Sequence, residues 1–262
     1  MRERWSLLTD TSSFGYRILE AASFIFFLPA LLVPYTHWFE CNKKVNFMNK
    51  FKIFEMDYRK VTGEPLLLDL SGVMRKVKTS LLLIVSVFTT LIFLSGRGFK
   101  GWQGIPFAYS VSLCAITTGA WCAMARTLEI LSEIIMSQLK QNVRELGYNC
   151  GEKVREFKML WLRLAELTQE FGNSLGYSYI CHIVVYFVQQ VLAVYGFLAE
   201  MDKGFTTTRF GFIVSIIMFT YAIFIICSCA HRTTQKVGYE FQRNLQQLGN
   251  MFTCGFNEAR YE

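Results

Sequence analysis

Apolar residues gather along this chain in five stretches that are separated by polar segments. The stretches cover about 21–35, 79–95, 105–125, 175–198 and 210–230. A helix that crosses a bilayer needs about 20 mostly apolar residues, with a range of about 17–25. Four stretches reach that range, and the first, which contains Pro29 and Pro34, is shorter. The pattern therefore predicts five transmembrane helices.

Outside these stretches, apolar residues recur every three or four positions in three segments. They are Leu128, Leu131, Ile135, Leu139, Val143 and Leu146; Val154, Phe157, Trp161, Leu164, Leu167 and Phe171; and Val237, Phe241, Leu245 and Leu248. This spacing predicts amphipathic helices with one apolar stripe each, and Gly147–Gly151 separates the first two as a hairpin. The stripes must be buried against one another or against partner subunits. The alternative is that these helices lie on the membrane surface.

Composition points to the same class of protein. The chain is 52% hydrophobic and only 18% charged, and it contains 24 Phe, 12 Tyr and 5 Trp, whereas a soluble domain is about 25% charged. A soluble fold could not cover so much apolar surface, and a disordered chain would be poor in aromatic residues. We expect an all-α, multi-pass transmembrane helical bundle whose helices extend into the cytoplasm.

The basic residues are distributed unevenly around the five spans. Of the 27 Lys and Arg, 20 fall in segments 38–78, 126–174 and 231–262, and 7 fall on the other side. Because basic residues concentrate in cytoplasmic loops, those three segments are predicted to be cytoplasmic and helical. The C-terminus is then cytoplasmic and the N-terminus external. The net charge of +7 reflects this topology, so we expect a lipid bilayer as the environment and no nucleic-acid partner.

An external N-terminus without a recognisable signal peptide is unusual for an odd number of spans. We therefore expect residues 1–262 to form a single, partial domain of a longer protein.

The chain offers little for catalysis or metal binding. Its 8 Cys fall in predicted spans or cytoplasmic segments, where disulfides are rare, and Cys227 and Cys229 lack the spacing of a zinc site. The 3 His, at positions 37, 182 and 231, lie in separate segments. We expect buried thiols, no metal, no cofactor and no enzymatic activity.

One span carries a polar stripe that could bind a ligand. Polar groups at membrane depth usually face the interior of the bundle or a cavity. The stripe consists of Tyr179, His182, Tyr186 and Gln189, at spacings of three, four and three. It predicts the wall of a ligand pocket, and the alternative is hydrogen bonding between helices. Further candidates, chosen on position alone, are Tyr109, Tyr195, Trp102 and Gln190.

An ordered series of short motifs runs through the second half of the chain. The series consists of Trp161–Asn173, Ala193–Gly196, Cys229–His231 and Val237–Gln242, followed by Leu245. Over about residues 140–250 it resembles the insect gustatory receptors, which are seven-span chemoreceptors, and within them the carbon dioxide receptor branch.

This resemblance implies a ligand-gated cation channel in the plasma membrane of sensory neurons, used for carbon dioxide detection. It also implies assembly of four gustatory receptor subunits, identical or different, through the cytoplasmic helices, with a small volatile ligand among the membrane helices. The candidate assembly residues are Leu131, Ile135, Leu139, Phe157, Trp161, Leu164, Leu167, Phe241 and Leu245.

In one respect the sequence departs from the family pattern. The five spans correspond to the second to sixth helices of the family, and no segment after Phe256 could form the seventh, which lines the pore. We therefore expect this chain alone to carry no current, as a partial gene model, a splice form or a fragment would. The alternative function is a non-conducting regulatory or scaffold subunit that assembles with full-length receptors.

Overall fold

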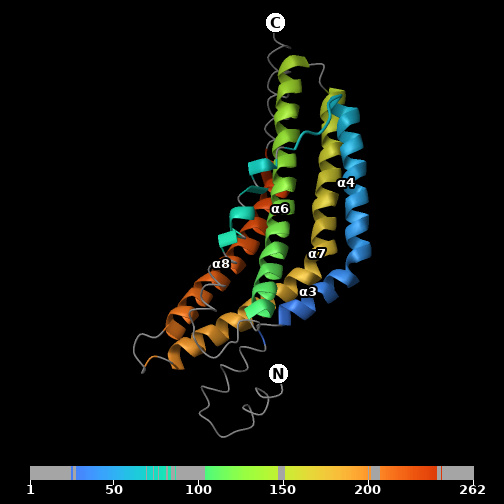
Figure 1. The fold of residues 1–262 in the computed structure, drawn as a ribbon. Coiled ribbons are helices and arrows are strands. Elements are labelled where there is room, and N and C mark those ends of the chain that lie inside the picture. The colour runs from blue at the N-terminus through green and yellow to red at the C-terminus, as the bar shows by residue number, and fades with distance from the viewer. Residues whose placement is uncertain are drawn as a thin grey trace. The chain divides into compact units, whose positions relative to one another are not determined.

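Helices make up the described part of the protein (Figure 1). A computed structural model describes residues 25, 28–68, 70–72, 74–75, 77–80, 82–83, 86, 104–146, 151–199, 201, 207–240 and 243. Its elements are α3 (Leu28–Phe39), α4 (Cys41–Thr62), α6 (Gly104–Leu146), α7 (Gly151–Ala199), α8 (Thr207–Gln235) and a π-helix (Lys236–Glu240). No strand occurs in these described ranges, which confirms the predicted all-α fold.

Three of the described helices are long and apolar enough to cross a membrane. Their segments are Tyr109–Glu145, Gly151–Ala199 and Arg209–Tyr239, which contain the third, fourth and fifth predicted spans. Most of the second predicted span and the beginning of the first lie outside the described residues. In α6 and α7 a single helix includes both a predicted span and a predicted cytoplasmic stripe.

Main-chain hydrogen bonds close the last turns of α3 and α4. Pro34 lies inside α3, and Glu40 closes the last turn by donating its N–H to the carbonyl of Thr36 at 3.1 Å. After Thr62, Gly63 has a φ of 76° and donates its N–H to the carbonyl of Arg59 at 2.9 Å. A glycine in this left-handed conformation is a common helix terminator.

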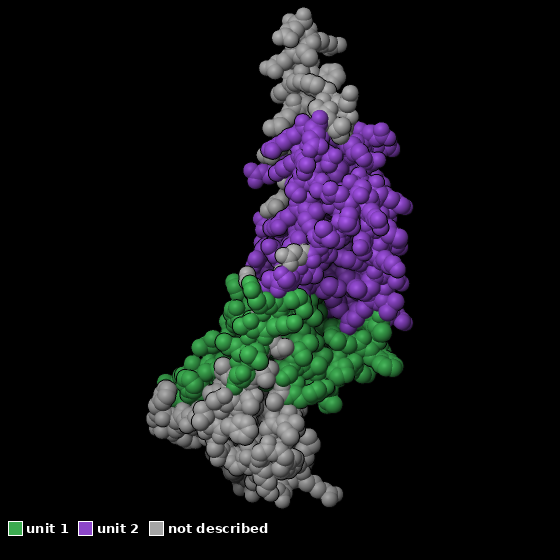
Figure 2. Space-filling view, turned by 45° about the horizontal axis from the view of Figure 1, so that its top comes forward, with its two compact units in different colours: residues 1–41, 74–122, 176–227 green, residues 42–73, 123–175, 228–262 purple. Residues whose placement is uncertain are grey.

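The chain divides into two compact units (Figure 2). Unit 1 comprises Met1–Cys41, Met74–Cys122 and Gly176–Cys227, and unit 2 comprises Asn42–Val73, Ala123–Leu175 and Ser228–Glu262. Unit 1 thus contains α3, the first half of α6, the second half of α7 and most of α8. Unit 2 contains α4, the second half of α6, the first half of α7 and the end of α8.

The interior of unit 2 is apolar and has ion pairs at its edge. Leu131, Ile135, Leu139, Phe157 and Leu164 are 0% exposed. Along one side, α4 packs antiparallel to α7, with ion pairs of 2.5 Å between Lys50 and Glu170 and 2.8 Å between Asp57 and Arg163. Burial of such side chains stabilises each by about 1.5–3 kcal/mol, so packing dominates over these exposed ion pairs.

In unit 1, a close approach brings α7 and α8 together. A Cβ atom built on Gly196 of α7 would lie 2.4 Å from the ring of Phe212 on α8. Only glycine leaves room for that ring, and its small size lets two membrane helices approach closely.

Candidate ligand cavity

The polar stripe of α7 faces the interior of unit 1. Tyr179, His182, Tyr186 and Gln189 are only 5%, 4%, 4% and 5% exposed. A buried polar group needs a hydrogen-bond partner, because burial without one costs roughly 1–3 kcal/mol in proteins. The partners of these four side chains therefore show whether the stripe joins helices or faces a cavity.

Tyr179 joins α7 to α6. Its hydroxyl donates to the main-chain carbonyl of Thr117 at 2.6 Å, and its ring packs on Trp121 with 4.2 Å between centroids. Tyr179 does not border the cavity described below.

His182 is held from both ring nitrogens. Nδ1 lies 2.6 Å from the carbonyl of Ser178, and Nε2 lies 3.3 Å from the hydroxyl of Thr117. Because a carbonyl only accepts, Nδ1 carries a hydrogen. The single hydroxyl hydrogen of Thr117 has the carbonyls of Leu113 and Cys114, both at 3.0 Å, as acceptors besides Nε2. His182 borders only a hollow of about 10 Å³, which is about the space of one water molecule. Tyr179 and His182 thus connect α7 to α6 by hydrogen bonds and do not line the larger cavity described below.

Tyr186 has a place in both patterns. Its hydroxyl lies 3.1 Å from that of Thr118 and 3.3 Å from the carbonyl of Cys114, both on α6. Tyr186 also lines the cavity that is described next. It therefore contributes both to the contact with α6 and to the wall of the cavity.

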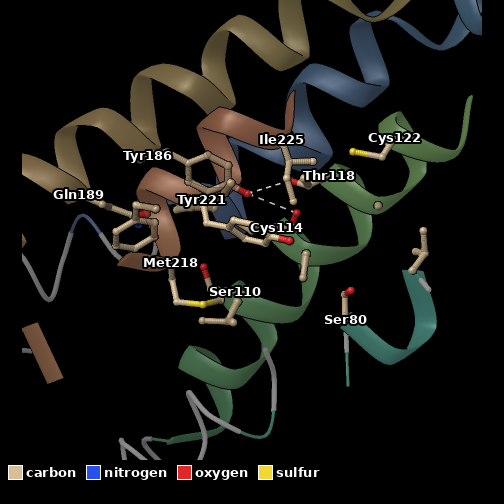
Figure 3. A pocket seen from close by; sticks show the side chains of 17 residues that line it. Ser80, Ser110, Cys114, Thr118, Cys122, Tyr186, Gln189, Met218, Tyr221 and Ile225 are labelled. Carbon is tan, nitrogen blue, oxygen red and sulfur yellow. Dashed lines mark hydrogen bonds between the residues drawn. The ribbon is translucent and has the colours of Figure 1, made fainter. Parts of the chain in front are cut away.

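The cavity has a volume of about 210 Å³ and lies wholly within unit 1 (Figure 3). Most of its wall is apolar. It is lined by Pro29 of α3, by Val77 and Ser80, by Ser110, Val111, Cys114, Ala115, Thr118, Gly119 and Cys122 of α6, by Tyr186 and Gln189 of α7, and by Met218, Phe219, Tyr221, Ala222 and Ile225 of α8.

Gln189 is a buried polar side chain of the wall that can bind a ligand. Its side chain is 95% buried and has no hydrogen-bond partner among the described residues. Figure 3 shows it beside Tyr186 on the α7 side of the cavity, across from Ser110 and Cys114 of α6. An amide offers both donors and an acceptor. A largely apolar cavity with a few polar groups is typical of a site for a small molecule.

Comparison with known protein families identifies the chain. The family model described as "7tm Chemosensory receptor" matches residues 10–258. The chain belongs to this family. Its relatives carry gustatory receptor names, and the family predicted from the sequence motifs is confirmed. The family is one of multi-pass membrane receptors and not of enzymes.

The curated relatives carry gustatory and odorant receptor names. "Gustatory and odorant receptor 24" of Anopheles gambiae is 28% identical over 83% of this chain and 47% of its own length. "Gustatory and odorant receptor 21a" of Drosophila melanogaster is 24% identical over 83% of this chain and 48% of its own. The chain spans about half the length of these relatives, and no solved structure matches it.

Three of the four ligand candidates chosen on position alone do not border the cavity. Gln190 donates from Nε2 to the hydroxyl of Thr220 of α8 at 3.0 Å and does not line the cavity. Tyr109 is exposed and Tyr195 is half-buried, and neither is part of the wall. Trp102 lies outside the described residues.

The α6 side of the cavity was missed by the sequence reasoning. Ser110, Cys114, Thr118 and Cys122 recur every four residues and all line the cavity. Small residues at this spacing let a neighbouring helix approach or leave space beside it. That repeat was the signal in the sequence that could have pointed to this wall.

The candidate assembly residues lie in the interior of unit 2. Leu131, Ile135, Leu139, Phe157, Trp161, Leu164 and Leu167 are all covered by helices of the same chain. Side chains buried in this way can act on subunit assembly only through the fold of unit 2, and a direct contact with another subunit stays a prediction. Phe241 and Leu245 lie outside the described residues.

Proposed function

We propose that this chain is part of a carbon dioxide receptor subunit that binds its ligand in the cavity of unit 1. The observation that carries the proposal is the amide of Gln189, which is buried in a largely apolar wall and has no partner among the described residues. Carbon dioxide has no net dipole and only weakly accepting oxygens. A largely apolar cavity with few donors suits such a molecule.

The receptor would act as a ligand-gated cation channel. Ligand binding can open a channel only when the open state binds ligand more tightly than the closed state. The cavity is suited to such a difference, because α3, α6, α7 and α8 all contribute to its wall. A shift of any of these helices changes the ligand's surroundings.

The assembly would be a tetramer with gustatory receptor subunits, identical or different, in the plasma membrane of sensory neurons. The uneven distribution of basic residues supports a cytoplasmic location for unit 2 and for the C-terminus. The exposed side chains Met159 and Leu162 on α7 offer an apolar contact for a neighbouring subunit, whereas the interior of unit 2 does not.

A second function has support in the structure of unit 2. This unit has its own buried interior, so it could serve as a scaffold for other subunits whether or not the chain conducts. The chain would then be a regulatory subunit that assembles with full-length receptors.

Recordings of carbon dioxide-evoked current separate the two functions. The chain is expressed alone and together with a full-length relative, and surface expression is measured in each case. Current from the chain alone supports a conducting subunit, whereas a changed response of the relative without such current supports a regulatory subunit. Neither a current nor a changed response at normal surface expression would contradict both.

The cavity itself is tested in the same recordings by filling it. Ala115→Leu adds three carbons to the α6 wall, and the matched control Ala120→Leu adds them at an exposed position of the same helix. Overpacking costs about 1–3 kcal/mol, so we expect Ala115→Leu to lower the sensitivity to carbon dioxide about tenfold or more. Equal responses of the two variants would argue against this cavity.

A further inference from the structure

A buried carboxylate lies at the end of α3, away from the ligand cavity. Glu40 is 2% exposed, and its carboxylate contacts Ser178 of α7, which is 0% exposed. Oε1 accepts the main-chain N–H of Ser178 at 3.1 Å, and Oε2 accepts its hydroxyl. One carboxylate therefore takes both hydrogens that this serine can donate.

The direction of the next hydrogen bond follows from that assignment. Nδ1 of His37 lies 3.2 Å from the hydroxyl oxygen of Ser178. A serine hydroxyl has one hydrogen, and Glu40 takes it. The oxygen can then only accept from His37, so Nδ1 carries a hydrogen. Three groups thus form a directed chain from His37 through Ser178 to Glu40.

The two ends of this chain differ in their access to protons. Glu40 is fully buried, whereas His37 is half-buried. Among the described residues, Tyr179 of α7 interacts electrostatically with Glu40 and with Cys122 of α6, and His182 bonds the carbonyl of Ser178. Lys44 follows four residues later on α4. In membrane proteins, chains of acidic residues and histidines are typical of proton relays.

We propose that His37, Ser178 and Glu40 form a proton-binding relay in unit 1. A proton is taken up at Nε2 of His37. The Nδ1 hydrogen moves to the oxygen of Ser178, and the hydroxyl hydrogen of Ser178 moves to Oε2 of Glu40. The result is a neutral Glu40, a neutral His37 with its hydrogen on Nε2, and one bound proton in total.

Proton uptake reverses the direction of both hydrogen bonds without breaking either one. Protonated Glu40 donates to the oxygen of Ser178, which now donates to Nδ1 of His37. The contact between α3 and α7 loses its negative charge and keeps its hydrogen bonds, so that proton binding changes the charge beside α7 in unit 1. This proposal does not depend on the identity of the ligand.

Infrared spectroscopy of the whole chain in lipid nanodiscs measures the carboxyl group directly. On acidification we expect a band of a protonated carboxyl group that disappears in Glu40→Gln. The control is Glu129→Gln, which removes another glutamate that is 2% exposed but is paired with Arg126 in unit 2. This control should keep the band. Absence of any band that depends on Glu40 would overturn the proposal.

Nitrogen NMR of the histidine rings tests the direction of the relay. In the unaltered chain, the hydrogen of His37 should move from Nδ1 to Nε2 with the same midpoint pH as the infrared band. In Glu40→Gln the amide donates to Ser178 at every pH, so His37 should carry its hydrogen on Nε2 throughout. A His37 ring that keeps Nδ1–H in acid would contradict the relay, and this measurement needs no variant to fold.

Discussion

The two units of the receptor are built from the same helices but are stabilised in different ways. In unit 2, the stripes of α6 and α7 bury aliphatic and aromatic side chains such as Leu131 and Phe157 completely. In unit 1, the same two helices meet through polar side chains, with Tyr179 and Tyr186 donating to or contacting main-chain carbonyls of α6. The cavity described above lies in unit 1.

The two units differ because unit 2 is predicted to lie in water and unit 1 in lipid. In water, burial of apolar surface drives helices together, and a close-packed interior results. In lipid there is no such driving force, so helices associate through small residues and hydrogen bonds. An interior of that kind leaves space beside small side chains such as Ala115 and Gly119. We therefore propose that unit 1 binds the ligand and that unit 2 gives structural support.

The largest effect is expected from a charge in the interior of unit 2. Leu164→Glu places a carboxylate at a position that is 0% exposed, where an unpaired charge costs several kcal/mol. We expect the melting temperature in detergent to fall by about 10 °C or more. Oligomers should also be lost on native gels, because the packing of unit 2 is disrupted.

Leu162→Glu is the matched control for that substitution. Leu162 is two residues away on the same helix and is 47% exposed, so thermal stability should stay close to that of the unaltered chain. Loss of oligomers with normal stability in this control would place a subunit contact on that exposed face. A stable Leu164→Glu variant would contradict the packing described for unit 2.

A smaller effect is expected where unit 1 depends on a small residue. Gly196→Ala puts a methyl group against the ring of Phe212, and such overpacking typically costs about 1–3 kcal/mol. Thermal stability should fall by a few degrees. Gly211→Ala on α8 meets no atom within 4 Å and should not lower it. Restored stability in the double variant with Phe212→Ala would locate the effect in this contact, and equal behaviour of both single variants would refute it.

The sequence predicted the elements of the receptor better than their contacts. Spacing of apolar residues located the helices now seen as α6, α7 and α8, because periodicity is a property of one helix. It also identified the polar stripe of α7. It could not decide between pocket and hydrogen bonds, because that depends on which atoms of α6 face each position. The structure places Tyr179 and His182 against α6 and leaves Gln189 at the cavity.

The burial of Glu40 is a second feature that the sequence alone could not predict. In the sequence it follows the first apolar stretch and belongs to a segment predicted to be cytoplasmic, so nothing marked it as buried. Its partner Ser178 is 138 positions away, and Ser178 alone carries no signal. Contacts of this kind depend on tertiary structure, which a single sequence without homologues does not reveal.

The most direct test of the account compares two adjacent glutamines of α7. Gln189 faces the cavity without a partner among the described residues, whereas Gln190 bonds Thr220 on α8. Each is replaced by Leu, and carbon dioxide responses are recorded in cells that also express a full-length relative, with surface expression measured. The account predicts that Gln189→Leu changes sensitivity by about tenfold, which corresponds to about 1.4 kcal/mol, while Gln190→Leu leaves it unchanged. Unchanged sensitivity in Gln189→Leu at normal surface expression would contradict a ligand site in unit 1 that uses this amide.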